Sequence, residues 1–121
     1  MSKRELSPDV TVVSEPREPD YLRLLKEGKV KISNAHNWCK GVAFGYTLGN
    51  RMKYCMMGSL GDSGRCQLTP VQAEAAMHLY RVLGHQPIVS FNDDPSTTHA
   101  DVLAAFDLAI EQATKDWLTQ R

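Results

Sequence analysis

Hydrophobic residues recur at helical spacing near the end of the sequence. They are Leu103, Phe106, Ile110, Ala113 and Trp117. Intervals of three and four residues place such positions on one face of an α-helix, where they can pack against a core. The pattern predicts a long C-terminal helix whose apolar face closes the interior of the protein.

A capping box marks the start of this helix. Thr98 stands three residues before Asp101, a spacing at which each side chain can bond to the backbone N–H of the other residue. We therefore expect the helix to begin at His99. Residues 92–95 (Asn-Asp-Asp-Pro) predict a turn before it, because Asn and Asp side chains bond to nearby backbone and Pro fixes one φ angle.

Three apolar residues of the predicted helix fall outside this face: Ala104, Ala105 and Leu108. We expect them to be exposed, since scattered apolar residues are common on protein surfaces. The alternative is that the N-terminal segment or a second copy of the chain covers them. A homodimer is therefore left open.

A second helix is predicted to begin after Thr69. Thr69 fits the N-cap, Pro70 the first helical position, and Gln72 completes a capping box. Apolar residues at 71, 75, 79 and 82 form its inner face, and Gly84 is expected to end it. On this helix His78 follows Glu74 by four residues, which predicts a surface ion pair when the histidine is protonated.

The remaining segments are assigned from local residue preferences. In chain order they predict a helix over 20–27 that ends at Gly28, a strand over 29–33, a hairpin strand over 42–48 with its turn at 49–50, a short buried helix over 54–60, an exposed loop over 61–65 and an extended segment over 87–91. For residues 41–53 a helix is the alternative to the hairpin.

The predicted fold class is α+β, mostly helical, with three to four helices and a small antiparallel β element. Residues 1–19 contain three prolines and many charges, which predicts a flexible N-terminal tail. Residues 20–121 are expected to form a single globular domain, a usual size for one hydrophobic core.

Composition narrows the function classes. The chain has 121 residues, 42% of them hydrophobic, with 14 basic and 14 acidic side chains. This balance leaves the protein without an overall positive charge to attract phosphate backbones, so nonspecific nucleic-acid binding is not expected. No apolar run reaches the about 20 residues of a membrane helix, and residues 1–8 lack the apolar segment of a signal peptide. Three cysteines, an odd number, fit reduced thiols. We expect a cytoplasmic protein that does not bind membranes.

The first candidate for chemistry is the thiol of Cys55. A nucleophilic cysteine needs a base or a helix N-terminus to lower its pKa. Cys55 precedes a predicted helix, His99 is the candidate base, with His78 and His85 as alternatives, and Asn92 or Asp93 could orient that base. The competing interpretation is that Cys55 is a small core residue.

The second candidate is an anion site in the glycine-rich segment 58–65. Ser59, Ser63 and Arg65 are its candidate ligand-binding residues, because backbone N–H groups in such loops can hold phosphate. Four residues with side chains of the kind that bind zinc form a candidate ligand set: His36, Cys39, Cys55 and Cys66. The Cys-x-x-Cys knuckle is missing, so neither a metal nor another cofactor is predicted.

Three motifs carry a family resemblance: residues 38–41 (Trp-Cys-Lys-Gly), 54–60 (Tyr-Cys-Met-Met-Gly-Ser-Leu) and 91–98 (Phe-Asn-Asp-Asp-Pro-Ser-Thr-Thr). On these the chain resembles a family of small bacterial and phage proteins known as domain of unknown function 6197. Phe91 stands where that pattern usually has Trp, and the segment between the last two motifs differs from it. The resemblance implies that Cys55, Gly58, Asn92 and Asp93 belong to a shared framework, and it implies no established activity.

Two functions remain open from the sequence. The preferred hypothesis is a non-enzymatic module that binds a protein partner or a small anionic ligand, because the informative residues serve helix caps and turns. The alternative is a small cysteine-dependent enzyme that uses Cys55 with a histidine and Asn92 or Asp93.

Overall fold

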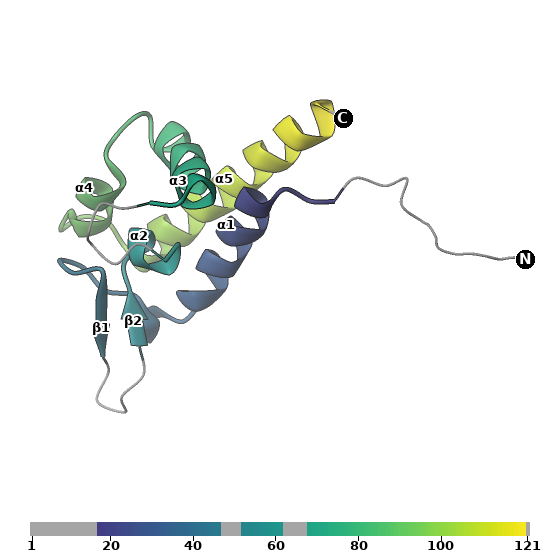
Figure 1. Cartoon of the computed structure of the whole chain (residues 1–121). Coiled ribbons are helices and arrows are strands. Elements are labelled where there is room, and N and C mark those ends of the chain that lie inside the picture. The colour runs from purple at the N-terminus through teal and green to yellow at the C-terminus, as the bar shows by residue number, and fades with distance from the viewer. Residues whose placement is uncertain (1–16, 47–51, 62–67, 121) are drawn as a thin grey trace, which may run out of the picture.

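Three helices form the body of the protein, which a computed structural model describes over residues 17–46, 52–61 and 68–120. They are α1 (Asp20–Lys31), α3 (Pro70–Val82) and α5 (His99–Thr119), and each packs against the other two (Figure 1). The smaller elements lie at one end of this bundle: η2 (Ala35–Asn37), β1 (Phe44–Tyr46), β2 (Met52–Tyr54), α2 (Met56–Ser59) and α4 (Ile88–Asp93). The predicted mostly helical α+β class is therefore confirmed. Residues 1–16, the predicted turn at 49–50 and most of the predicted loop at 61–65 lie outside the described residues.

Both predicted capping boxes are present. Thr98 Oγ1 accepts from the backbone N–H of Asp101 at 3.1 Å, and Asp101 Oδ2 accepts from that of Thr98 at 2.9 Å. Thr69 and Gln72 make the same reciprocal pair at the start of α3. These local bonds explain why the starts of α3 and α5 could be located from sequence.

The buried face of α5 is wider than the predicted stripe. Its buried residues are Val102, Ala105, Phe106, Ala109 and Ala113. Our expectation that Ala105 is exposed is wrong, because α1 and α3 both pack on α5 and together cover more than one stripe. Leu108 remains 47% exposed. None of the helices in the described ranges combines the length and the apolar character needed to cross a bilayer.

Helix α1 does not end at Gly28, and the predicted strand over 29–33 is wrong. The helix continues to Lys31 with Gly28 buried inside it. A Cβ at Gly28 would lie 3.0 Å from Leu60 Cδ2 and 3.1 Å from Ser59 Oγ. The glycine therefore permits close approach of α1 to α2, and it does not serve here as a helix terminator.

The predicted extended segment over 87–91 is also wrong, because α4 is helical from Ile88 to Asp93. Proline is tolerated before the first turn of a helix, and Pro87 occupies the N-cap. Ile88 and Asn92, one turn apart, are both buried. Asn92 and Asp93 end this helix, so the expected turn begins only at Asp94.

The predicted hairpin is present in its described part. Strands β1 and β2 are antiparallel, with Gly45 opposite Lys53. Trp38 forms a parallel bridge with Tyr54 on the other side of β2. The predicted short buried helix after this strand is confirmed as α2.

Helix α2 lies directly against the backbone that leads into β1. The backbone N–H of Cys55 donates to the Ala43 carbonyl at 3.1 Å. A Cβ placed on Gly58 would lie 2.0 Å from the same carbonyl oxygen. No side chain fits there, so a glycine at 58 is a steric requirement of this packing.

The expected surface ion pair of His78 is wrong, because His78 is 9% exposed and packs between helices. Its ring stacks on Tyr21 of α1 with 4.8 Å between centroids. Burial, and then the positive charge of Arg81, lower the pKa of His78 below its usual value, while Asp116 and Glu74 oppose this shift. The neutral ring is therefore the form that the packing favours.

We expect Gly58→Ala to lower the free energy of unfolding by at least about 2 kcal/mol, since the new Cβ forces α2 away from Ala43. Gly45→Ala is the matched control, because its Cβ would have no neighbour nearer than Lys53 Cβ at 4.0 Å. Denaturant titration followed by circular dichroism measures both. Equal stability of the two variants would contradict this packing.

We expect stability to fall as the pH drops below about 6.5, the usual pKa of an unfolded histidine. In that window the unfolded chain takes up a proton at His78, while the folded protein, with its lowered pKa, stays neutral. His78→Phe, which keeps a stacking ring, should lose this part of the acid destabilisation, and His36→Phe at an exposed histidine should retain it. Denaturant midpoints at about pH 7.5 and pH 5.5 test this, and identical pH dependence in both variants would refute it.

Candidate functional site

Asn92 is the centre of the hydrogen-bond network at this end of the protein. Its Oδ1 accepts from the indole Nε1–H of Trp38 at 2.8 Å and from the backbone N–H of Met56 at 3.0 Å. Its Nδ2 donates to the carbonyl of Cys39 at 3.1 Å and to Asp93 Oδ1 at 2.9 Å. The side chain is 1% exposed and all its hydrogen-bonding positions are used. Asn92 therefore joins α4, α2 and the segment around Trp38.

Asp93 continues this network to the loop before β1. Its Oδ1 also accepts from the backbone N–H of Gly41 at 2.8 Å, where a φ of +84° suits glycine. Among the described residues no Lys, Arg or His forms a salt bridge with Asp93. The carboxylate is thus fixed in position by neutral donors in the described part of the chain.

Cys55 is the N-cap of α2. Its Sγ accepts from the backbone N–H of Gly58 at 3.2 Å, and the residue is 6% exposed. The other described thiol, Cys39, has its pKa raised by burial and, secondarily, by the nearby Cys55. The surroundings of Cys39 therefore favour the neutral thiol over the reactive thiolate.

His99 is held at the C-terminal end of α1. Its Nε2 donates to the Ile32 carbonyl at 2.6 Å, and its ring contacts Trp38 with 5.9 Å between centroids. The structure thus brings Cys55, Asn92 and Asp93 to one place and ties His99 to the end of α1. The catalytic assignment of these four residues stays a prediction.

The candidate anion site divides between described and undescribed residues. Ser59 is fully buried, and its hydroxyl donates to the Met56 carbonyl at 2.6 Å. Ser63 and Arg65 lie outside the described residues. Within the described part of the chain, no three His, Cys, Asp or Glu side chains are grouped to hold a metal ion.

Cys55 and Asp93 line a small recess of about 170 Å³. Val89 lies one helical turn before Asp93 on α4 and lines the same recess. The other lining residues come from α2 and the loop before β1: Gly41, Val42, Ala43 and Met57. One face of α4 thus points into the interior through Ile88 and Asn92, and another toward the recess through Val89 and Asp93.

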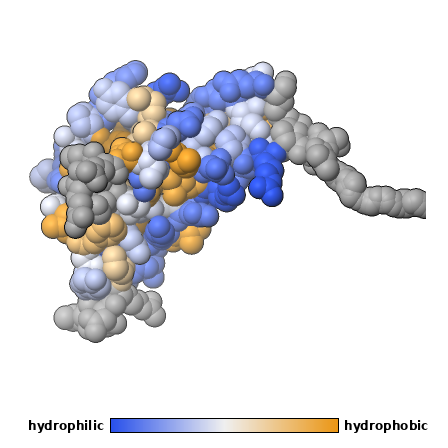
Figure 2. Space-filling model, viewed as in Figure 1, coloured by the Kyte–Doolittle hydropathy of each residue, from blue (hydrophilic) through white to orange (hydrophobic). Residues whose placement is uncertain are grey.

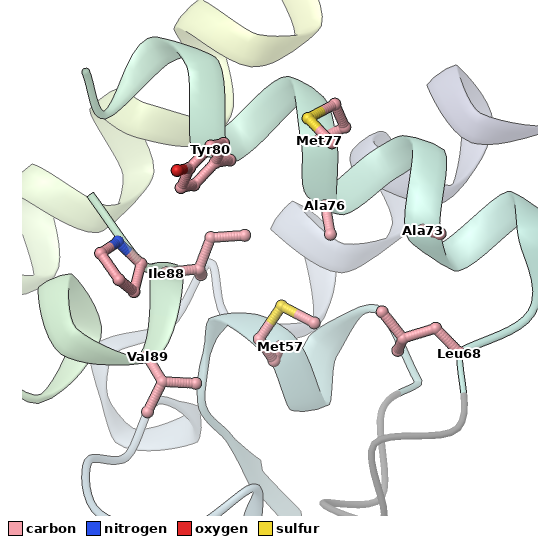
Figure 3. A pocket seen from close by; sticks show the side chains of 9 residues that line it. Met57, Leu68, Ala73, Ala76, Met77, Tyr80, Ile88 and Val89 are labelled. Atoms are coloured by element: carbon pink, nitrogen blue, oxygen red, sulfur yellow. The ribbon is translucent and has the colours of Figure 1, made fainter. Parts of the chain in front are cut away.

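A larger apolar groove of about 570 Å³ lies between α3 and α4 (Figure 3). The Met57 side chain extends from α2 into the space between α3 and α4 and faces Ile88, and Tyr80 lines the side formed by α3. Figure 2 shows hydrophobic residues reaching the surface in this region among hydrophilic ones. The remaining lining residues are Leu68, Ala73, Ala76, Met77, Pro87 and Val89.

Sequence reasoning missed this groove. The sequence does contain one signal for the groove. Residues 88 and 89 are both apolar, and in a helix two adjacent side chains point in different directions, so only one of them can be buried in the core. An extended segment, as predicted here, does not place Val89 beside α3, so the local pattern does not identify it as an exposed apolar residue of a groove.

The comparison with known families decides what the chain is related to. The model of DUF6197, a family of unknown function, matches residues 16–112. The chain belongs to DUF6197. The match includes α2, α4 and the Trp38 segment, so the Asn92 network of this DUF6197 protein lies wholly inside it. No curated protein and no solved structure matches the sequence.

We expect Asn92→Asp to destabilise the fold by about 3 kcal/mol or more at neutral pH. The new carboxylate would face the Cys39 carbonyl and the Asp93 carboxylate where Nδ2 now donates, so a buried charge would be left uncompensated. Asn34→Asp is the matched control, because Asn34 is exposed and its Oδ1 only accepts from His36 N. Denaturant midpoints measure both variants, and an unchanged midpoint for N92D would contradict the central role of Asn92.

Proposed function

We propose that this DUF6197 protein is a non-enzymatic binding module whose groove between α3 and α4 takes a hydrophobic segment of a protein partner. The observation that carries the proposal is the groove itself. Three large apolar side chains are left open to solvent along it: Leu68 is 36% exposed, Met77 46% and Val89 53%. Exposed apolar side chains gathered in one concave place are typical of interaction sites.

The size of the groove supports a short segment as the occupant. Covering the exposed part of each of these three side chains contributes roughly 1 kcal/mol. These three side chains alone contribute too little for a permanent subunit interface, so the groove fits a weak contact with one segment that makes further contacts beside it. A groove between two helices fits an amphipathic helix, whose apolar residues at i, i+3 or i+4 and i+7 can enter it.

The chemistry of the lining favours a protein segment over a small polar molecule. Pockets for small ligands carry several convergent polar groups, whereas the Tyr80 hydroxyl is the main polar side-chain group of the groove. Met57 and Met77 have flexible, polarizable side chains that adjust to different apolar partners.

The alternatives have less support from the described residues. For a cysteine enzyme, Cys55 caps α2 and the candidate base, His99, is bonded to Ile32. For an anion site, the Ser59 hydroxyl is buried and bonded to Met56. These contacts are what a structural role requires of both residues.

Selection of random peptides on the full chain tests the proposal. We expect the enriched peptides to share apolar residues at helical spacing. The double variant Met77→Gln/Val89→Gln should bind them at least about ten-fold more weakly, because it makes the groove polar without changing its charge.

The matched control is Val30→Gln/Leu108→Gln, which makes the same kind of change at exposed apolar residues of α1 and α5 away from the groove. Its affinity for the peptides should equal that of the wild type. If the enriched peptides bind the groove variant and the wild type equally well, the groove is not the binding site and the proposal is wrong.

A further inference from the structure

The small recess beside the groove has a chemistry that the proposed function does not use. Met57 and Val89 line both spaces, so the recess opens beyond the same two side chains that border the groove. Any segment that lies over Val89 therefore passes the mouth of the recess. The structure thus offers a second, smaller contact to whatever occupies the groove.

From this geometry we infer that the partner segment carries a lysine or arginine next to its apolar residues, and that this side chain enters the recess to meet Asp93. The inference rests on the proposed function, since it specifies the segment that the groove takes. It commits to one occupant, a basic amphipathic segment of a protein.

The shape and lining of the recess suit a long cationic side chain. Its volume of about 170 Å³ is small, and Val42, Ala43 and Met57 make most of its wall apolar. Lys and Arg side chains pack their aliphatic stems along such a wall while the charged tip seeks a polar partner. Asp93 is the carboxylate in the lining.

The Asp93 carboxylate is held with one oxygen still available. Gly41 N–H and Asn92 Nδ2 both donate to Oδ1, and no described residue donates to Oδ2. Lys40, which precedes Gly41 in the chain, is occupied elsewhere, since its Nζ donates to the carbonyls of Asp94 and Thr97. The carboxylate thus has an acceptor position for an incoming cation.

Docking of an apolar segment over the recess raises the energetic cost of leaving the Asp93 carboxylate without a counter-ion. A segment that covers the recess removes water from Asp93, and a carboxylate buried without a counter-ion is strongly unfavourable. A cation on the segment removes that cost and adds a charge-assisted hydrogen bond. A purely apolar segment of the same shape leaves the carboxylate uncompensated, so the site discriminates against it.

The experiment uses the peptides enriched on the full wild-type chain. We expect a Lys or Arg at one fixed position beside the apolar pattern. For the best peptide, Asp93→Asn should weaken binding about ten-fold, and replacing that basic residue by Met should weaken it similarly. The two changes together should cost no more than either alone, because they remove one interaction.

Two controls keep the result interpretable. In Asp93→Asn the side-chain Oδ1 still accepts from Gly41 and Asn92, so the melting temperature should stay near that of the wild type. Asp94→Asn changes the neighbouring carboxylate, whose Oδ1 accepts from Ser96 and which does not line the recess. It should leave the affinity unchanged.

The outcomes separate the two proposals. Peptides that need the groove but show no basic position, or whose affinity is unchanged by D93N, overturn this inference and leave the groove proposal standing. Enrichment that does not depend on Met77 and Val89 overturns both. A basic position whose effect vanishes in D93N, together with loss of binding in the groove variant, supports both.

Discussion

The side-chain amide of Asn92 is the contact on which the arrangement of this end of the protein depends. It bonds at once to Trp38, Cys39, Met56 and Asp93, which belong to three separate segments of the chain. Because the Asn92 amide is buried, replacing it by an apolar side chain would leave the buried backbone N–H of Met56 without an acceptor and would also remove the bonds to Trp38, Cys39 and Asp93. The network fixes where α4 lies relative to α2, and this placement creates the groove and the recess.

The four positions singled out by the family resemblance each have a physical role in this arrangement. Gly58 is required by the Ala43 carbonyl, Cys55 caps α2, and Asn92 ties the segments together. Asp93 holds Gly41 with one oxygen, and in our proposal it offers the other to a partner. Structural contacts therefore explain three of the four positions without catalysis. The fourth is the one that we connect with binding.

Local chemistry determined which parts of the fold could be predicted. The starts of α3 and α5 were located because their capping boxes involve residues three apart, which the sequence displays directly. Helix α4 was missed because Ile88 and Val89 are β-branched and favour extended structure by themselves. In the folded protein this helix is held by hydrogen bonds from Asn92 to Met56, Cys39 and Trp38. These partners are at least 36 positions away in the sequence, so no local pattern reveals the bonds. The same holds for Gly28, whose partners Ser59 and Leu60 come from α2.

The candidate site was predictable only in part. The sequence identifies Asn92 and Asp93 as candidate residues of a turn, whereas their shared place beside Cys55 follows from tertiary contacts.

Hydrogen exchange at the Met56 amide and the Trp38 indole, followed by NMR, tests the central role of Asn92 most directly. We expect both protons to exchange only as fast as the amide of Phe106 in the core of α5, through global unfolding. Exchange of either proton at the rate of an exposed group, with Phe106 still protected, would contradict the central role of Asn92.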